Sequence, residues 1–541
     1  MSRFLDEHTA VIRPPLGLDE YALAVEAFDQ ALRASPNDAG AARHRYMTLV
    51  EQRKWSELRS KATARAATAP WDATSWLARG LASHELQDEP AAAAAFDSAL
   101  SAMSQREQSR YADLGRILRP ADSTSYAHMN AAARQRLSRV FWVTADPSPL
   151  IAGNVVRLEF LSRMAYADLR WPSIEGDSPG ADADRGQIWV RYGPPGVIAS
   201  FSPDVFGVNS VADTPPGFGL LLWYYPTLNL QFIFLAPPTY GMARLADRYR
   251  TIAEEARLQA PARWVNLPVA RTLADSITVQ LSRFREGRDS IALVVFARLP
   301  VGQLKAPPGG SDDLVSEALS LYSSDGAQLL LDSTTRAVGK QGADGAEVRG
   351  WRERVPAVGP ALFRVDALGS GRVSAARAMS EVRLLADSGF GVSDLLLADM
   401  VSPGAGAAQR WSDFLITPNV GTVQQGKSLA LLWETYDLAA RGGAASYKVA
   451  LTLERVQPGG ARGVAVRILN GVRGVAGRGA IGVDRVTIAY ERTVPARPIA
   501  VDYLTLDVGD TAPGSYRLSV DVEDQITGRH VISERTLWVR K

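Results

Sequence analysis

Carboxylates and arginines in the middle of the chain are the residues best suited to chemistry. Glu159 and Arg163 lie four residues apart, and Asp184 and Arg185 open a later segment. A guanidinium clamps a carboxylate with two parallel hydrogen bonds, and two facing carboxylates are the minimal machinery of glycoside hydrolysis. These residues therefore indicate a polar pocket, although a charged helix flank with internal ion pairs is the simpler interpretation of Glu159 and Arg163.

Histidine and cysteine are missing from this region. None of the five histidines lies between Met129 and Arg529, and the chain has no cysteine. A Ser-His-Asp hydrolase or a zinc enzyme centred there is therefore excluded, as are disulfides and a cysteine nucleophile. Phosphate-cradling loops and dinucleotide fingerprints do not occur either. We predict no assigned catalytic residue, no metal and no cofactor, and we favour a function without catalysis.

An acidic loop precedes Arg185. Glu175, Asp177, Asp182 and Asp184 carry oxygen atoms of the kind that calcium prefers. Their spacing matches no calcium-binding loop, and short clusters of Asp, Gly, Ser and Pro are ordinary turn chemistry. We therefore interpret the loop as a solvated turn and give the binding role to Arg185, at the entrance to the next element.

Charge and hydropathy exclude two further classes of function. The 541 residues include 60 lysines and arginines against 58 aspartates and glutamates, without a basic stripe. Nucleic acid is therefore not an expected partner. No apolar run reaches the length of a membrane span, and the segment from Met1 to Leu18 carries no export signal. The chain as written is expected in the cytoplasm, or in the periplasm or outside the cell if a signal has been cleaved from it.

Two predicted elements position the charged residues. Apolar residues at helical spacing predict one amphipathic helix within Pro149–Leu169, with Asn154 as its cap. The run Gln187–Tyr192, stopped by Gly193-Pro194-Pro195, predicts a strand. Alternation along that strand places Trp189 on the face that points away from the core.

Two runs rich in leucine and aromatic residues follow. Leu220–Tyr225 and Leu230–Ala236, joined by a short Pro/Asn connection, predict a hairpin. Aromatic side chains are common anchors of protein interfaces, whereas burial in a core is the competing interpretation. The residues predicted to bind a partner combine charged anchors with aromatic area: Arg185, Asp184, Glu159, Arg163, Trp189, Tyr192, Trp223, Tyr224 and Tyr225.

The N-terminal part has a helical repeat. Pro36 and Pro70 are 34 residues apart, and Ala92, Phe96 and Ala99 repeat a pattern found 68 residues upstream. This is the spacing of tetratricopeptide repeats, in which small residues let paired helices touch and an aromatic fills the gap. The array is short, so two interpretations stay open: it docks a peptide, or it only packs on the rest of its own chain.

From residue 276 onward the sequence alternates as antiparallel strands do. The pattern predicts a first sandwich that ends with Gly391–Ala398 and a second that begins after Ser402–Gly406. Similar turns at Pro360–Arg364 and Pro513–Arg517 favour two related, Ig-like modules in tandem. The basic, glycine-rich segment Gly459–Gly482 is interpreted as a flexible insertion into the second module.

Part of the chain resembles a known family. Residues that match its pattern occur in the same order between positions 141 and 232: Phe141-Trp142, Asp146-Pro147, Arg157, Glu159-Phe160, Arg163, Ala165-Tyr166-Ala167, Asp184-Arg185-Gly186, Tyr192-Gly193-Pro194-Pro195, Trp223-Tyr224-Tyr225-Pro226, Leu228-Asn229-Leu230 and Phe232. The set is similar to the GWxTD-domain family of bacterial proteins, which is named after a Gly-Trp-x-Thr-Asp motif. The resemblance implies an architecture and no particular reaction.

The naming motif itself is altered in this chain. Residues 180–184 keep the glycine and the final aspartate, whereas Ala181 replaces the tryptophan and Ala183 replaces the threonine. A tryptophan buries area, and threonine and aspartate bond to nearby backbone. We therefore interpret the motif as a turn-and-packing device.

Together these patterns predict a multidomain protein. Its parts are tetratricopeptide-like α-helical repeats over 1–104, a mixed α/β GWxTD-like module over 105–268, and antiparallel β-sandwiches over 269–403 and 404–541. Such modules present edges and loops to partners. We expect a non-catalytic interaction or scaffold protein that docks a protein or peptide, with the bacterial cell envelope as one place where it would act. The alternative is a carboxylate-dependent hydrolase or carbohydrate-active enzyme, which requires an open pocket with carboxyl groups about 5 to 10 Å apart.

Overall fold

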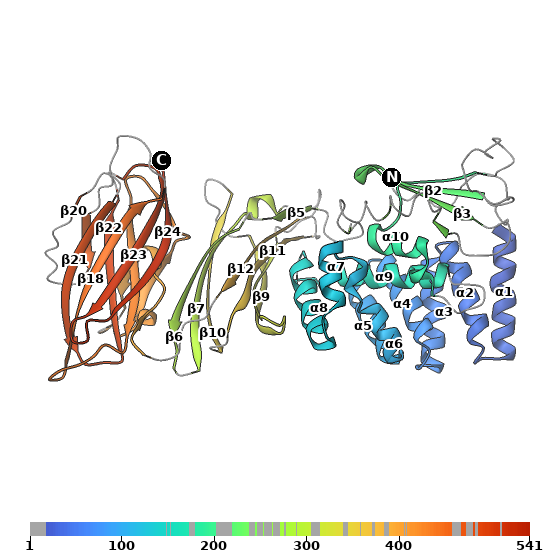
Figure 1. The fold of residues 1–541 in the computed structure, drawn as a ribbon, viewed down its shortest axis with the longest axis horizontal. Helices are drawn as coiled ribbons and strands as arrows, with labels where there is room; N and C mark the ends of the chain where they lie inside the picture. The colour runs from blue at the N-terminus through green and yellow to red at the C-terminus, as the bar shows by residue number, and fades with distance from the viewer. Residues whose placement is uncertain are drawn as a thin grey trace. The chain divides into compact units, whose positions relative to one another are not determined.

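The computed structural model divides the chain into two compact units, the helical unit (1–268) and the β unit (269–541) (Figure 1). The structure describes residues 18–147, 149–151, 153–171, 179–201, 219–236, 244–245, 253, 262, 271–274, 277–287, 289–304, 314–338, 345–356, 359–370, 374–382, 389–404, 406, 408–456, 467–471, 480–481, 485–508 and 511–541. Among these residues, no helix combines the length and apolarity needed to cross a bilayer.

The helical unit begins with an array of helices: α1 (Leu18–Ala34), α2 (Ala39–Glu51), α3 (Trp55–Thr68), α4 (Ala73–Glu85), α5 (Glu89–Ala102) and α6 (Gln105–Tyr111). Both ends of α4 fall 34 residues after those of α2, and α5 follows α3 in the same way. The caps repeat too, since Asp38 and Asp72 each accept a backbone N–H at the start of these helices. The 34-residue period of the sequence is therefore a period of the structure.

Packing between paired helices depends on one small and one large residue. A Cβ added to Gly80 would lie 2.7 Å from the ring of Phe96, so glycine is needed for α4 and α5 to approach. One repeat earlier, Tyr46 occupies the position of Gly80, and Ala62 that of Phe96. Tyr46 and Ala62 are both fully buried. The large and small residues have exchanged helices, and the gap stays filled.

The rest of the helical unit contains α7 (Pro120–Ala127), α8 (Ala131–Ala145), α9 (Val155–Arg170) and α10 (Asp184–Tyr192), with 3-10 turns η2 (Leu114–Arg116), η3 (Gly180–Asp182) and η4 (Pro226–Leu228). The predicted helix is confirmed as α9, and its cap is Asn154, which accepts the N–H of Arg157 at 2.9 Å. This helix packs on α2, α4 and α5 (Figure 1). The array therefore holds a helix from its own chain.

The predicted strand Gln187–Tyr192 is wrong, because these residues form α10. Asp184 stands in its first turn, where a carboxylate favours a helix, and Gly193 ends it with φ 72°. A short apolar run does not distinguish a buried strand from a buried helix. Helical geometry turns Trp189 into the core, where 7% of it is exposed, so the expectation that Trp189 faces away from the core is also wrong.

Four antiparallel strands complete the helical unit: β1 (Val197–Phe201), β2 (Gly219–Tyr225), β3 (Leu230–Ala236) and β4 (Arg244–Leu245), paired in that order. The predicted hairpin is confirmed as β2 and β3, with Trp223 opposite Phe232. Its connection is η4 followed by Asn229, which adopts the left-handed conformation with φ 50°. An asparagine tolerates this conformation better than most residues do.

The described residues of the β unit form four sheets. Sheet I has the order β5-β12-β11-β8-β9 and sheet II the order β10-β7-β6. Their strands are β5 (Arg271–Ala274), β6 (Thr278–Arg285), β7 (Ser290–Leu299), β8 (Leu314–Ser323), β9 (Gln328–Ala337), β10 (Glu347–Pro356), β11 (Ala361–Gly369) and β12 (Ser374–Val382), with the 3-10 turn η5 (Val301–Gln303).

Sheet III has the order β15-β14-β17-β22-β19, with β13 also on β17, and sheet IV the order β16-β24-β23-β18-β21-β20. Their strands are β13 (Gly391–Val392), β14 (Leu396–Pro403), β15 (Phe414–Pro418), β16 (Thr422–Gln424), β17 (Ser428–Tyr436), β18 (Ala444–Arg455), β19 (Arg467–Gly471), β20 (Ala480–Ile481), β21 (Arg485–Pro495), β22 (Ile499–Asp507), β23 (Gly514–Asp524) and β24 (His530–Arg540), with the 3-10 turn η7 (Trp411–Asp413). Nearly all neighbours are antiparallel; β5 with β12 and β16 with β24 are parallel.

The four sheets share three hydrophobic layers. One layer joins sheets I and II around Leu293 and Phe363, and another joins sheets III and IV around Trp433 and Tyr516. Between them, a third layer joins sheets II and III, with Phe296 on β7 and Leu432 on β17. Sheets II and III are therefore covered on both faces, and the two sandwiches form one continuous stack.

The segment Gly391–Ala398 does not end the first sandwich. β13 and β14 both pair with β17, so this segment belongs to sheet III. The Pro- and Gly-containing stretch Ser402–Gly406 follows as a connection between β14 and β15, two neighbours in that sheet. Within the predicted insertion Gly459–Gly482, β19 and β20 are strands, and the other residues lie outside the described part of the chain.

Candidate functional site

The altered motif forms a tight junction between α9 and α10. A Cβ on Gly180 would lie 1.9 Å from the carbonyl oxygen of Ala167 in α9, so only glycine fits there. Ala181 is fully buried, and its N–H donates to Asp168 at 2.9 Å. Ala183 is the N-cap of α10 and makes no side-chain cap bond. The position of the family's threonine is therefore a capping position, where a hydroxyl would bond to the helix.

Asp184 and Arg185 lie in the first turn of α10, and both are half-buried. The Asp184 Oδ2 atom accepts the N–H of Leu245 at 2.7 Å, which ties α10 to β4. The Arg185 guanidinium lies 4.6 Å from the ring centroid of Trp171. Stacking on an indole holds the guanidinium against the protein. Both predicted anchors thus take part in packing between elements of the helical unit.

Glu159 and Arg163 form an ion pair within α9, as a charged flank predicts, but the pair is buried. Glu159 is 1% exposed and Arg163 is 4% exposed. Arg163 also donates to the carbonyl oxygens of Val190 at 3.1 Å and Arg191 at 3.3 Å. These carbonyls end α10, where a helix leaves its acceptors unsatisfied. The pair therefore fixes the end of α10 against α9.

All but one of the predicted aromatic anchors lie in buried groups of rings, one around Trp189 and one around Tyr192. Trp189 stacks on Tyr166 with ring centroids 4.3 Å apart, and its centroid lies 6.0 Å from that of Trp223. Tyr192 stacks on Phe232 of β3 at 5.9 Å. Rings at these separations stabilise a core. Trp189, Tyr192, Trp223 and Tyr225 are buried, and Tyr224 on the other face of β2 is half-buried.

A histidine from the array enters this region, although none occurs in the module's own sequence. His84 of α4 is buried, and within the described part of the chain its ring nitrogens have no hydrogen-bond partner. Burial lowers the pKa of His84, and the nearby Glu159 carboxylate acts in the opposite direction. No imidazole was expected in this module, because no histidine occurs in its part of the sequence. This expectation is wrong, since α4 packs on α9 and brings His84 close to Glu159. The imidazole is therefore enclosed by the protein, and burial disfavours its charged form.

Asp168 is a polar hub that the sequence did not single out. It accepts hydrogen bonds from Arg110 at 3.2 Å, from the hydroxyl of Tyr111 at 2.8 Å and from the N–H of Ala181. These bonds connect α6, α9 and η3, far apart in the sequence. Burial is the main reason that the pKa of Tyr111 lies well above its ordinary value. A single aspartate on a helical face carries no sequence signal for such a role.

The residues considered for calcium take different positions. Asp182 pairs with Arg116, and Asp184 holds Leu245, while Glu175 and Asp177 lie outside the described residues. Within the described ranges, no three His, Asp or Glu side chains gather as metal ligands do.

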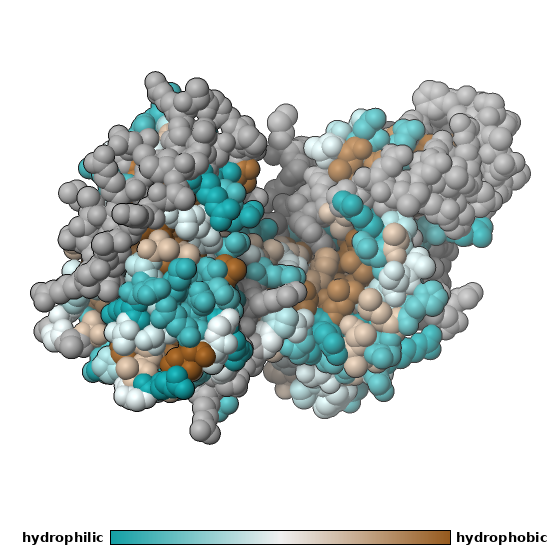
Figure 2. All heavy atoms as spheres, turned by 60° about the vertical axis from the view of Figure 1, so that its left-hand side comes forward, coloured by the Kyte–Doolittle hydropathy of each residue, from teal (hydrophilic) through white to brown (hydrophobic). Residues whose placement is uncertain are grey.

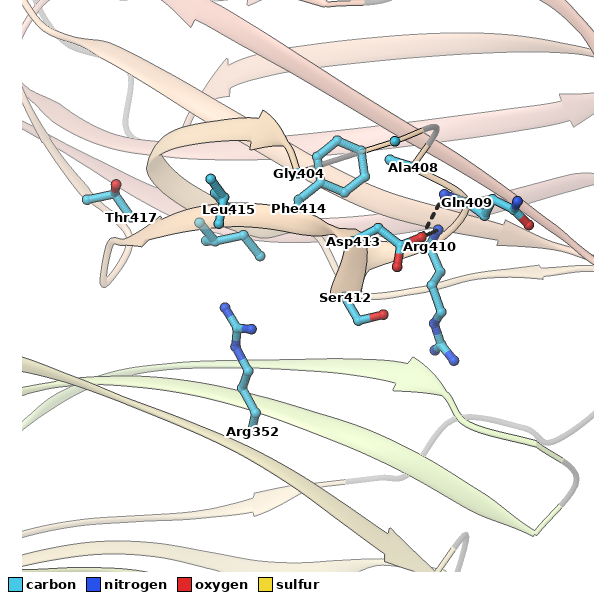
Figure 3. A pocket seen from close by; sticks show the side chains of 12 residues that line it. Arg352, Gly404, Ala408, Gln409, Arg410, Ser412, Asp413, Phe414, Leu415 and Thr417 are labelled. Carbon is cyan, nitrogen blue, oxygen red and sulfur yellow. Dashed lines mark hydrogen bonds between the residues drawn. The ribbon is translucent and has the colours of Figure 1, made fainter.

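An open groove lies in the β unit, between β10 and β15, the end strands of sheets II and III (Figure 3). This edge groove has a volume of about 770 Å3 and is lined by Arg352 and by residues of the segment from Gly404 to Thr417. Arg352 is exposed and lies 5.8 Å from the ring centroid of Trp411. It has no ion-pair partner among the described residues, whereas Arg410 pairs with Glu286 at 2.8 Å.

Buried Glu434 of β17 holds one wall of the edge groove. Its carboxylate accepts the N–H of Trp411 at 2.6 Å and the hydroxyl of Tyr436 at 3.0 Å, and Arg410 lies 3.8 Å away. Burial raises the pKa of Glu434 to about 7, against the lowering effect of these three partners. The start of η7, which shapes the groove, is therefore fixed from the core of the stack.

The sequence did contain a signal for this groove. Pro and Gly around 403–406 precede a short strand with exposed Leu415, which is typical of an edge strand. The sequence of β10 carries a weaker signal, with exposed arginines at positions 352 and 354. Its apolar residues are few, because an end strand covers less of the core.

Comparisons with known proteins give no family. No family model matches the chain, and no curated protein matches it. Among solved structures, the chain is similar to a cohesin module from a Clostridium perfringens family 33 glycoside hydrolase, at 10% identity and TM-score 0.16, over 22% of this chain and 90% of that one. It is also similar to the C-terminal domain of the Streptococcus agalactiae AgI/II polypeptide BspA, at 12% identity and TM-score 0.16, over 49% of this chain and all of that one.

A cohesin from the archaeon Archaeoglobus fulgidus matches at 9% identity and TM-score 0.14, over 27% of this chain and 92% of that one. At these TM-scores the likeness carries no argument about fold or function. The functional argument therefore depends on the residues of the chain itself.

Proposed function

We propose that the chain is a non-catalytic interaction or scaffold protein that docks a protein or peptide partner on its β unit. The observation that carries the proposal is the edge groove, which combines two end strands with the exposed guanidinium of Arg352, an arginine without an ion-pair partner in the described part of the chain. Strand edges present backbone donors and acceptors to another chain, and arginine is enriched in protein interfaces.

The proposal moves docking away from the residues first considered for it. The Glu159 carboxylate is paired with Arg163 in the core, and the Asp184 carboxylate holds Leu245. A hydrolase that used these two carboxylates would need them open to a substrate and a water molecule. Their bonds to neighbouring elements favour a structural role, and so favour binding over hydrolysis.

In this proposal the helical array is tetratricopeptide-like and serves as a scaffold. Its helix period and the Gly80–Phe96 contact support the likeness. α9 packs on α2 and α4, so the array holds part of its own chain. The GWxTD-like module then joins to the array through α9, and the two sheet pairs are Ig-like sandwiches that present the groove.

Site-specific photo-crosslinking tests the proposal. A benzophenone amino acid replaces Thr417 in the edge groove of the full chain, and irradiation follows in a lysate of the cells that produce the protein. The matched control carries the same amino acid at Ile532, which is 60% exposed on β24 and does not line the groove. We expect one discrete cross-linked product from position 417 that is absent from position 532.

Two results would contradict this function. Identical product patterns from both positions would show that the groove has no partner in the lysate. Turnover of a glycoside or ester substrate that a folded Glu159→Gln variant has lost would instead establish the hydrolase.

A further inference from the structure

β15 (Phe414–Pro418) is an end strand of its sheet. β14 pairs with one of its edges, and no strand in the described part of the chain pairs with the other. Half of the backbone N–H and C=O groups of an end strand point away from its neighbour and remain able to bond to an added strand. The edge groove runs beside this strand, since Phe414, Leu415, Ile416 and Thr417 all line it.

One face of β15 looks toward Arg352. Phe414 and Ile416 belong to the hydrophobic layer between sheets II and III. On β10, Arg352 stands directly opposite Val294, which is in the same layer, so the two side chains share a face. Figure 3 shows Arg352 projecting from β10 toward β15. A strand added to β15 would present every second side chain to this guanidinium.

The other face of β15 is apolar and exposed. Leu415 is 64% exposed. Met400 of β14 stands opposite Thr417 and is 55% exposed, so it shares this face. On the face of the molecule shown in Figure 2, the forward part is mainly hydrophilic and its hydrophobic patches are small and separate. Two adjacent exposed apolar side chains thus lie beside the open strand edge, where an added strand would cover them.

The groove's other charges leave Arg352 as the available cation. Arg410 is engaged by Glu286 and by the carbonyl oxygen of Arg285 at 3.0 Å. The Asp413 carboxylate accepts the backbone N–H groups of Gln409 and Arg410, at 2.8 and 3.1 Å, as Figure 3 shows. Its Oδ2 atom is therefore turned to the protein's own backbone, and Arg352 is the cation of the groove that an acidic side chain can meet.

We infer that the partner in the edge groove is an extended peptide segment of alternating acidic and apolar residues, which adds a strand to β15. Its acidic side chains meet Arg352, its apolar side chains cover Leu415 and Met400, and its backbone bonds to the open edge. Main-chain bonds supply affinity in this mode, and alternate side chains supply specificity. The inference rests on the proposed docking function and adds the chemistry of the partner.

The test uses the full chain and synthetic nine-residue peptides, with binding measured by fluorescence anisotropy. The probe alternates glutamate and valine. One comparison peptide alternates lysine and valine, and another places the same glutamates and valines in two blocks. Two further peptides carry N-methyl groups on alternate amides, one for each register. We expect the glutamate–valine probe to bind. The lysine–valine peptide, the block peptide and one of the two N-methylated peptides are expected to bind at least tenfold more weakly, whereas the other N-methylated peptide, whose methyl groups point away from β15, keeps its affinity.

Protein variants locate the contact. Arg352→Glu is expected to weaken binding of the glutamate–valine probe at least tenfold and to strengthen binding of the lysine–valine peptide. The matched control is Arg354→Glu, on the same face of β10 but outside the groove, which is expected to change affinity less than twofold. Hydrogen exchange of the amides of residues 414–417 is expected to slow when the probe is bound.

Several outcomes would overturn the inference. Equal affinity of the probe for the wild type and for Arg352→Glu would show that no acidic side chain of the peptide contacts Arg352. Equal affinity of the two N-methylated peptides would show that the peptide does not add as a strand. Dimerisation of the chain that Arg352→Glu abolishes would show that a second copy occupies the groove. A cross-linked partner at position 417 without probe binding would keep the proposed function and reject this partner chemistry. If neither a cross-linked partner at position 417 nor binding of the probe is seen, both proposals fail.

Discussion

The helical unit and the β unit each have a surface on which a further segment can pack, and among the described residues only the surface of the helical unit is covered. In the helical unit, α9 lies on α2 and α4 and buries Glu159 and Arg163. In the β unit, the edge groove leaves Arg352 exposed beside an unpaired strand edge. An arginine thus has a structural role in the helical unit, as Arg163, and is available to a partner in the β unit, as Arg352. Burial and hydrogen-bond partners, rather than residue type, decide which arginine can serve a partner.

The largest expected effect tests the filled surface. Arg163→Met removes the cation that Glu159 and the last carbonyls of α10 share, and so leaves a buried carboxylate without this partner. Breaking a buried ion pair on one side typically costs about 3 to 5 kcal/mol. We expect a loss of this size in the unfolding free energy of the helical unit, measured by hydrogen exchange of α9 amides in urea. A loss below about 1 kcal/mol would mean that α9 is not fixed by this pair.

A second prediction concerns the wall of the open groove. Burial raises the pKa of Glu434 from 4.5 to about 7, so between these pH values the folded state binds the proton more tightly than the unfolded chain does. The contribution of Glu434 to stability is therefore largest below the lower value and is lost as the pH rises through the higher one. Glu434→Gln stays neutral at every pH. As the pH rises from about 4.5 to above 7, the unfolding free energy of this variant should therefore increase relative to that of the wild type by up to about 3 kcal/mol.

Denaturant unfolding of both proteins at about pH 4.5 and about pH 8, followed by hydrogen exchange in sheet III, measures this difference. The charge of Glu286 also raises the pKa of Glu434, so Glu286→Gln serves as the control. A difference between wild type and Glu434→Gln that stays constant with pH would show that this group keeps an ordinary pKa in the fold.

A smaller effect is expected at the altered motif. Ala183 is the N-cap of α10 with φ −69° and ψ 154°, and its side chain makes no cap bond. Ala183→Thr supplies the hydroxyl that the resembled family has at this position, and such caps contribute about 1 kcal/mol. Ala183→Val has the same shape without the hydroxyl and is the control. Thermal unfolding followed by circular dichroism should give a higher unfolding temperature for Ala183→Thr than for Ala183→Val. The reverse order would mean that α10 needs no cap here.

The smallest effect belongs to the open groove. Arg352→Met removes an exposed guanidinium that has no ion-pair partner among the described residues. Surface substitutions of this kind change the unfolding free energy by about 0.5 kcal/mol or less. The matched comparison with Arg163→Met, the same chemical change on a buried arginine, therefore separates a structural role from an available one. A large loss for Arg352→Met would place this arginine with the buried network.

Local sequence patterns predicted the elements well where a period and its end signals occur together. The helix capped by Asn154 and the hairpin of β2 and β3 both have a clear period and clear stops. The strand predicted at Gln187–Tyr192 failed because six residues contain fewer than two turns of a helix. Over that length, a helical and an extended pattern place apolar residues similarly.

Long-range packing was the part that the sequence did not reveal. The burial of Arg163 depends on the carbonyls of α10, and the approach of His84 to Glu159 depends on α4 meeting α9. Neither relation has a period or motif along the chain. A clearer signal was available in the apolar run Ile291–Leu299, which does not alternate. Continuous runs indicate strands buried on both faces, and β7 is such a strand.

The continuous layers of the β unit also have a mechanical consequence. A chain of sandwiches joined by linkers bends and stretches between its modules, as beads on a string do. Here the hydrophobic layer between sheets II and III, together with the bidentate contact of Arg283 with Asp394, fixes the two sandwiches against each other, so that they do not move independently. Pulled at its ends, this unit would resist as a single strut, and the strand edges beside the groove would keep their spacing while a load passed through them.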